Sequence, residues 1–245
     1  MSRFSTLSIL AFVAVLFVPA FLSAGIIVDQ ALTNTSQIRS ASNNPFFPGA
    51  QNAAAINISY GTPAGGTVNG IGFHDLDLNA NPQAGNGIAV NNGAPGVTFD
   101  FQFGCASDCP GSRNLGSAGI SGPDAGVANA VALGNRYLTI PANNHAQNIV
   151  TFHGLQSNAD VYIQLIGGQH NWQDTTRVYV DGDGVTQDTG TLIGDWTSNK
   201  TNQTAGLFGF DTTTDANGDL RIGLSTTRFG GVAAIIVQQS ANRVN

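Results

Sequence analysis

The 245-residue sequence contains no glutamate, and Lys200 is its only lysine. Charged residues make up 10% of the chain, and the formal net charge is −6. Without glutamate, the chain cannot carry the His-Glu-x-x-His motif of zinc proteases or the glutamate that closes an EF-hand calcium loop. The sequence has no run of lysine and arginine that could bind the phosphates of a nucleic acid, so nucleic acid is not an expected partner.

The chain is also poor in residues that favour helices. Asn, Asp, Thr, Ser and Gly dominate its polar content, and all of them disfavour helix interiors. Asp, Asn and Gly suit tight turns, and Thr suits strands. Hydrophobic residues make up 42% of the chain, enough for a packed core, which argues against disorder. We therefore expect an all-β protein.

The N-terminus has the pattern of an export signal. Arg3 supplies a positive charge, an apolar run covers residues 7–18, and Pro19 ends that run. The small residues Ala20 and Ala24 predict cleavage after one of them, and we favour Ala24. A retained membrane anchor is the alternative, but the run is shorter than the ~20 apolar residues that a membrane span needs.

Removal of the predicted signal peptide, residues 1–24, leaves residues 25–245, which we interpret as a single domain. The sequence therefore predicts a secreted, extracellular or cell-surface protein that does not insert into a membrane after the signal is removed.

Turn residues separate short strand-like segments along most of the chain. Gly96–Phe103 alternates apolar and polar residues, the period of a half-buried strand. The other predicted strands are Gly25–Val28, Ile56–Tyr60, Thr67–Phe73, Asn148–Phe152, Val161–Ile166, Arg177–Val180, Ala205–Phe210, Leu220–Ser225 and Val232–Val237. Such regular spacing predicts an antiparallel sandwich or barrel.

The segments between these strands are predicted as loops and turns, with one exception. Thr33–Asn52 and Asp75–Asn92 lack periodicity and are predicted loops. The Asn-Gly pair in Asp215–Asp219 predicts a hairpin turn. Asp124–Leu133 is the one helix candidate, with Asp124 as its N-cap and a glycine after its end.

Several strand and turn patterns agree with one known family. The patterns are those of Ile149–Leu155, Val161–Leu165, Arg177–Gly182 and Gly231–Val237. Together they resemble the galactose-binding-like jelly-roll family, which includes malectin-like domains, and Thr67–Phe73 is similar to an opening strand of such domains in exported bacterial proteins. The resemblance implies an antiparallel β-sandwich (jelly roll) with one short helix and long loops, and carbohydrate as the class of ligand.

Cys105 and Cys109 lie close together after a predicted strand. In an exported chain they are expected to form a disulfide, whose small loop gives only about 2 kcal/mol of stabilisation. A redox role is the alternative, but it needs an activated thiolate, and nothing nearby in the sequence supplies one.

Asp75, Asp77 and Asn79 place side-chain oxygens at alternate positions, as calcium loops do. The sixth position of that pattern is Ala80 instead of glycine. A structural Ca²⁺ ion at these residues is therefore one hypothesis, and an ordinary loop is the other.

The segment before the predicted strand at Arg177 has the chemistry of a sugar site. An aromatic ring stacks on the apolar face of a sugar, while amides, carboxylates and imidazoles bond its hydroxyls. The predicted ligand-binding residues are His170, Asn171, Trp172, Asp174, Arg177 and Trp196. The alternative for each tryptophan is that it closes one end of the sandwich core.

No catalytic motif is present. A Gly-x-Ser-x-Gly elbow is missing, the four histidines lack metal-ligand spacing, and His153 reads better as a packed or surface residue than as a ligand. The leading hypothesis is thus a non-catalytic protein that binds carbohydrate or an extracellular matrix or surface component. The rival is a structural or adhesive protein that binds protein partners or itself, and a hydrolase ranks last.

Overall fold

The computed structural model describes residues 25–59, 67–77, 84–90, 94, 96–102, 138–141, 149–167, 175–180, 190–197, 205–226 and 229–240. Strands make up most of this part of the chain, and its only helical elements are two 3₁₀ turns, at Thr35–Gln37 and Ala41–Asn43. The prediction of an all-β protein is therefore confirmed. The predicted helix at Asp124–Leu133 lies outside the described residues.

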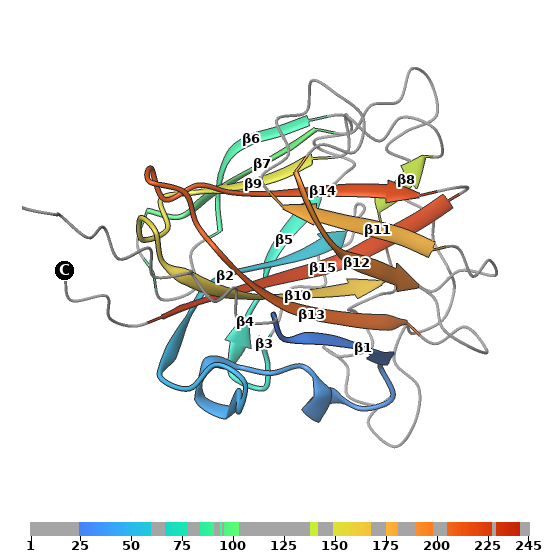
Figure 1. Ribbon diagram of the computed structural model, residues 1–245, viewed down its shortest axis with the longest axis horizontal. Helices are drawn as coiled ribbons and strands as arrows, with labels where there is room; N and C mark the ends of the chain where they lie inside the picture. Colours follow the sequence, from blue (N-terminus) through green and yellow to red (C-terminus); the bar gives the residue numbers. More distant parts are fainter. Residues whose placement is uncertain are drawn as a thin grey trace, which may run out of the picture.

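The strands form two large sheets and a small hairpin (Figure 1). The seven-stranded sheet has the order β1 (Ile27–Ala31), β13 (Gly206–Thr213), β10 (Asp160–Gly167), β15 (Phe229–Ser240), β2 (Ala50–Ser59) and β5 (His74–Asp77), and β8 (Leu138–Pro141) also pairs with β15. The six-stranded sheet has the order β12 (Thr191–Thr197), β11 (Thr175–Val180), β14 (Leu220–Thr226), β9 (Ile149–His153), β7 (Thr98–Gln102) and β6 (Ala84–Ala89). The hairpin consists of β3 (Thr67–Val68) and β4 (Ile71–Gly72).

Most successive strands in the second half of the chain belong to different sheets, so the chain crosses between the sheets repeatedly. β9, β11 and β14 belong to the six-stranded sheet, whereas β10, β13 and β15 belong to the seven-stranded sheet. The paired strands are antiparallel, except that β2 and β5 are parallel. The fold is an antiparallel β-sandwich, as predicted.

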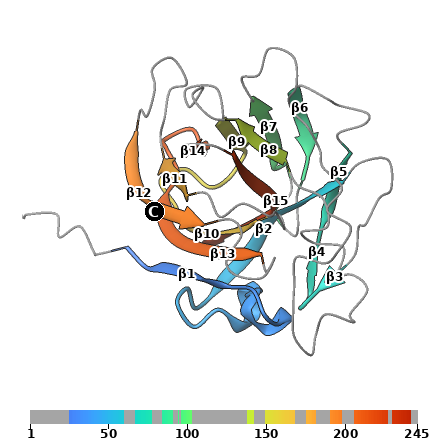
Figure 2. The same ribbon diagram turned by 90° about the vertical axis from the view of Figure 1, so that its right-hand side faces the viewer.

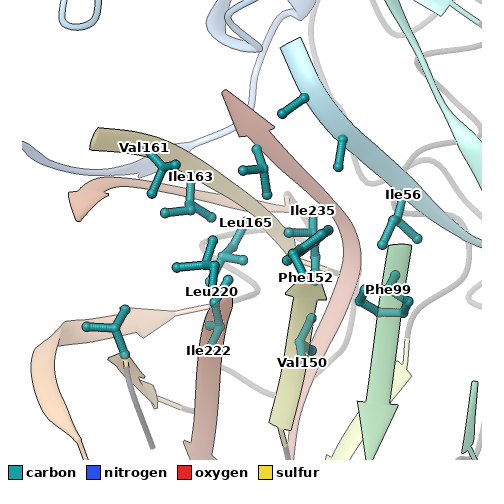
Figure 3. Close-up of a cluster of buried hydrophobic side chains, with 14 of the residues drawn as sticks. Ile56, Phe99, Val150, Phe152, Val161, Ile163, Leu165, Leu220, Ile222 and Ile235 are labelled. Atoms are coloured by element: carbon teal, nitrogen blue, oxygen red, sulfur yellow. The ribbon is translucent and has the colours of Figure 1, made fainter. Parts of the chain in front are cut away.

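The main core fills the space between the sheets. In β9, Val150 and Phe152 are buried and alternate with partly exposed residues. From the opposite sheet, Leu165 of β10 and Ile235 of β15 lie beside Phe152, and Val161 and Ile163 lie nearer Leu220 of β14 (Figure 3). The rings of Phe99 and Phe152 lie 5.3 Å apart. Successive side chains of a strand point to opposite faces of the sheet, so the buried residues, at every second position, form the face that packs in the core.

The seven-stranded sheet is also covered on its outer face, by the segment 32–47. Leu32 and Ile38 from this segment pack with Ile166, Leu207 and Ile236 in a second buried cluster. Seven of the eight residues of β10 are consequently buried. A strand covered on both faces reads as a nearly continuous apolar run, and β10 follows this pattern after Asp160 except at Gln164.

Side-chain amides hold this covering segment to the sheet. Gln164 accepts a hydrogen bond from the Arg39 N–H at 2.8 Å and donates one to the Arg39 carbonyl at 2.7 Å. Gln238 donates to the same carbonyl at 2.7 Å, donates to Asn52 at 3.0 Å and accepts from Asn44 at 2.8 Å. Gln164, Gln238 and Asn52 lie on the adjacent strands β10, β15 and β2, and we call these three residues the amide ladder.

Two local predictions from the first half of the sequence are wrong. The strand predicted at Thr67–Phe73 is the β3–β4 hairpin, because Asn69 and Gly70 have positive φ angles of 52° and 79° and reverse the chain. The loop predicted at Asp75–Asn92 contains most of β5 and all of β6, which pair with β2 and β7.

The hairpin predicted at Asp215–Asp219 is also wrong. This turn joins β13 to β14, which belong to different sheets, so the two strands do not pair with each other. Asp215 accepts hydrogen bonds from the backbone N–H groups of Asn217 and Asp219, each at 2.8 Å. A Cβ atom at Gly218 would lie 2.1 Å from the carbonyl oxygen of Leu155. Gly218 also has a positive φ of 81°, so this position of the turn requires glycine for both reasons.

Candidate functional site

A cavity of about 680 Å³ lies where edge strands of the two sheets approach each other. β1 is the edge of the seven-stranded sheet and β12 is the edge of the six-stranded sheet. β1 pairs with β13 from Ile27–Phe210 to Ala31–Gly206, so residues 211–213 of β13 extend past the start of β1. The cavity lies at this uncovered end, on the side of the molecule where Figure 2 shows β12 and the start of β1. We call it the edge groove.

The edge groove combines apolar and oxygen-bearing side chains. Ile27 and Leu192, which are 53% and 51% exposed, lie on its two edge strands, and Phe47 adds an aromatic ring. The polar residues that line it are Asp160, Thr191, Asp211, Thr212 and Thr213. No lysine, arginine or histidine is among the described residues that line it. The described lining of the groove therefore presents apolar surface, hydroxyls and two carboxylates, and it includes no cationic side chain.

Aromatic packing supports one wall of the edge groove. The rings of Phe46 and Phe47 lie 6.4 and 6.5 Å from that of Tyr162, which is 1% exposed. Arg39 lies over the Phe46 ring, 4.8 Å from its centroid. Burial raises the pKa of Tyr162 to about 12, while nearby Arg39 lowers it and Asp211 raises it by smaller amounts. Tyr162 is therefore an uncharged packing residue at neutral pH.

The predicted ligand-binding residues are only partly described. His170, Asn171, Trp172 and Asp174 lie outside the described residues. Arg177 is on β11, and its side chain is 56% exposed. Its Nε lies 3.7 Å from Oδ1 of Asp195, its register partner on β12. An exposed ion pair of this kind contributes little to stability, so Arg177 stays a predicted ligand contact.

The prediction that Trp196 contacts a ligand is wrong. Its side chain is 0% exposed, belongs to the main core and lies 6.5 Å from the Phe208 ring, so it has no face to offer a sugar. A Cβ atom at Gly206 would come within 2.9 Å of the indole Nε1, which shows how closely β13 approaches the ring. The structure therefore agrees with the alternative interpretation, in which this tryptophan is part of the sandwich core.

The residues of the calcium hypothesis start in a strand. Asp75 is on β5, beside Asn57 of β2, and accepts a hydrogen bond from the Asn57 amide at 2.8 Å. Asp77 ends the same strand, and Asn79 lies outside the described residues. Within the described ranges, no three His, Cys, Asp or Glu side chains form a group that could hold a metal ion. Calcium binding stays a prediction.

The other predicted features of the chain lie outside the described residues. These are the signal peptide, residues 1–24, and the cysteines Cys105 and Cys109. No helix of membrane-spanning length and hydropathy occurs in the part of the chain that the structure describes.

Sequence analysis missed a cluster of titratable residues around His153. Its Nδ1 lies 2.8 Å from Oδ1 of Asp219, and its Nε2 lies 3.0 Å from Oδ2 of Asp100. Burial, the largest single influence, lowers the pKa of His153, but the hydrogen bonds and charges of Asp219 and Asp100 outweigh it and raise the pKa above 6.5. With both ring nitrogens bonded to carboxylates, the imidazole joins β9, β7 and the turn before β14.

Comparison with known proteins identifies no relative by sequence. No family model and no curated protein matches the chain. Among solved structures, the CBM22-1–GH10 modules of endo-1,4-β-D-xylanase 10B from Clostridium thermocellum, complexed with xylohexaose, match 46% of this chain and 23% of that chain, with 12% identity and a TM-score of 0.28. The CBM22-1 xylan-binding domain of Xyn10C from Paenibacillus barcinonensis matches 61% of this chain and 85% of that chain, with 14% identity and a TM-score of 0.29. Likenesses this distant do not identify a ligand for this chain.

Proposed function

We propose that this chain is a secreted or cell-surface protein that binds carbohydrate without catalysing a reaction, and that the edge groove is its binding site. One observation carries the proposal: the groove places apolar side chains opposite carboxylate and hydroxyl groups, without a cationic residue among the described residues of its lining. The membership of a galactose-binding-like family is part of the same proposal.

The size and lining of the edge groove suit a sugar. Its volume, about 680 Å³, falls within the roughly 300–1,000 Å³ of ordinary small-molecule sites. Phe47, Ile27 and Leu192 supply surfaces for the C–H faces of sugar rings, and carboxylates and hydroxyls bond ring hydroxyls. This division of labour, apolar packing with a few polar groups that orient the ligand, is the usual one in binding sites.

The charges favour a neutral glycan over an acidic one. Asp160 and Asp211 line the groove, and the whole chain has a formal net charge of −6. A uronate or a sulfated sugar would meet like charge at the site and over the surface, which lowers both its affinity and its association rate. We therefore expect neutral polysaccharides to bind and acidic ones to be rejected.

A polysaccharide array, followed by affinity measurements on three variants, tests the site. Leu192→Ser and Asp160→Asn change the edge groove, whereas Arg177→Ala changes an exposed residue of β11 outside the groove lining and so tests the site predicted from the sequence. Loss of the Leu192 contact removes part of the ~1.5–3 kcal/mol available from burying a leucine, so Leu192→Ser should weaken binding about tenfold. Arg177→Ala should bind as the parent protein does.

Three results would contradict the proposal. The first is that no neutral polysaccharide binds, and the second is that a bound polysaccharide is cut into shorter products. The third is that Arg177→Ala loses binding while Leu192→Ser and Asp160→Asn bind as the parent protein does. The last result would move the site to the other residues predicted from the sequence, namely His170, Asn171, Trp172, Asp174 and Arg177.

A second candidate function, adhesion to proteins or to another copy of the chain, is favoured by the two edge strands. Ile27 on β1 and Leu192 on β12 each expose a large apolar side chain, and unprotected strand edges readily pair with other chains. Sedimentation of the mature protein over a range of concentrations distinguishes the two. Self-association that Leu192→Asp abolishes would support adhesion, whereas a monomer that binds neutral glycan would support the first proposal.

A further inference from the structure

The start of β1 lies against a carboxylate in the wall of the edge groove. The N–H of Ile26 donates a hydrogen bond to Oδ1 of Asp211. A Cβ atom built on Gly25 would lie 3.0 Å from the same oxygen. Gly25, Ile26 and Asp211 all line the groove. The backbone at residue 25 is therefore in contact with the Asp211 side chain.

The nitrogen of Gly25 must also lie near this carboxylate. It is bonded to the same Cα atom that would carry the Cβ, at about 1.46 Å, so it falls within roughly 6 Å of Oδ1. In an uncut chain this nitrogen is a neutral amide. If the chain is cut before residue 25, it becomes an ammonium group with three N–H donors, at a distance where opposite charges attract appreciably.

We propose that the chain is cut between Ala24 and Gly25 and that the new α-ammonium group of Gly25 binds the carboxylate of Asp211. Hydrolysis of the Ala24–Gly25 peptide bond consumes one water molecule and releases Ala24 as a carboxylate and Gly25 as an ammonium. The proposal concerns residues 25 and 211 and does not depend on what the edge groove binds.

The geometry distinguishes between the two cleavage sites that the sequence left open. A cut after Ala20 would leave four further residues attached at the point where the groove opens, and the nitrogen beside Asp211 would stay an uncharged amide. A cut after Ala24 places a charge where a carboxylate already lies. A larger residue at this position would place its Cβ 3.0 Å from Oδ1 of Asp211, so the carboxylate would have to move slightly away from the backbone nitrogen.

The pairing would fasten the first strand of the sandwich. β1 is an edge strand and contacts the rest of its sheet through β13 alone. The ion pair would hold the start of β1 just beyond its first register pair, Ile27–Phe210.

Two forms of the otherwise identical mature chain test the pairing. One begins at Gly25 and the other at Ser23, and a protease that accepts glycine or serine after its cleavage site produces both. Each is also prepared with Asp211→Asn, which keeps an oxygen acceptor for Ile26 and removes the charge. The Gly25 form should melt about 2–4 °C above the Ser23 form, and Asp211→Asn should abolish this difference.

A chemical measurement covers the case in which Asp211→Asn does not fold. Lys200 is the only lysine, so the mature chain has two primary amines for an acylating reagent. The α-amine of the Gly25 form should react several-fold more slowly, relative to Lys200, than the α-amine of the Ser23 form. Equal rates in the two forms would overturn the proposal.

The remaining outcomes are also decisive. N-terminal sequencing of the exported protein should find Gly25 first, and a mature chain that begins at Phe21 would overturn the proposal. So would equal melting temperatures of the Gly25 and Ser23 forms, or a difference that persists unchanged in Asp211→Asn.

Discussion

Replacement of Gln164 by leucine tests how the covering segment 32–47 is held on the sandwich. Gln164 is 1% exposed and makes two hydrogen bonds to the backbone of Arg39. Leucine has a similar size and would keep the apolar packing, but it cannot bond to a backbone. Gln238 still donates to the Arg39 carbonyl in this variant, so the group left without a side-chain partner is the Arg39 N–H.

The expected cost follows from that single group. A fully buried donor left without a partner costs about 1–3 kcal/mol, and because the Arg39 contact is only partly buried we expect the lower end, about 1 kcal/mol, which lowers the melting temperature of a domain of this size by roughly 2–4 °C. Gln238→Leu removes a different set of bonds and leaves the Arg39 carbonyl to Gln164. The double variant removes both donors from that carbonyl, so its destabilisation should exceed the sum of the single changes by about 0.5–3 kcal/mol.

Trypsin provides a local assay, because Arg39 is itself a cleavage site. Its carbonyl is bound by two side chains, and Ser40 after it is 2% exposed, so cleavage requires the segment to leave the sheet. Gln164→Leu should raise the initial rate of cleavage after Arg39, measured by mass spectrometry. Gln30→Leu on β1 is the control, since Gln30 lies outside the amide ladder. Unchanged stability and unchanged cleavage in Gln164→Leu would refute the reasoning.

Four further predictions concern other parts of the molecule. The folded-state pKa of His153 is raised, so its stabilising contribution is complete below about 6.5 and is lost as the pH rises through the higher folded-state value. His153→Gln should remove this part of the pH dependence of the melting temperature, and an unchanged pH profile would contradict the assignment. Trp196→Ala should cost about 3–5 kcal/mol in denaturant unfolding because the ring is fully buried. Trp172→Ala should leave stability nearly unchanged if that residue is a surface contact, and a comparable loss would make it a second core residue. Excess chelator should lower the melting temperature if calcium is bound at Asp75, and an identical curve would remove calcium from the account.

Strands with one buried face were predictable from the sequence. The alternation in Gly96–Phe103 marks β7, because one side of that strand faces the core and the other does not. β12 was missed, since it is an edge strand whose burial pattern does not alternate and whose interior contains Gly194. The same edge position makes β12 useful as a wall of the groove. Local patterning thus identifies strands best where the fold is most regular.

The edge groove could not be read from the sequence, because its parts are far apart in the chain. Phe47, Asp160, Leu192 and Asp211 come from four separate segments that only the strand order brings together. The prediction for Trp196 failed for a related reason. The residues around it in the sequence are typical of a loop, but Trp196 lies on a strand and its side chain faces the core. Arg177 and Asp195, by contrast, are adjacent in register, and a correct pairing of β11 with β12 would have joined them.

The amide ladder also links the stability of the outer layer to the shape of the edge groove. It anchors residues 39–44, and the chain continues directly to Phe46 and Phe47, which pack on Tyr162. Tyr162 fits under these rings because Gly209, two residues before its register partner Asp211 on β13, has no side chain: a Cβ atom there would lie 2.2 Å from the tyrosine oxygen. Loosening the ladder therefore shifts Phe47 in the groove wall as well as uncovering the sheet. Since the ladder residues do not line the groove, a ladder variant that weakens ligand binding would act through the position of this wall.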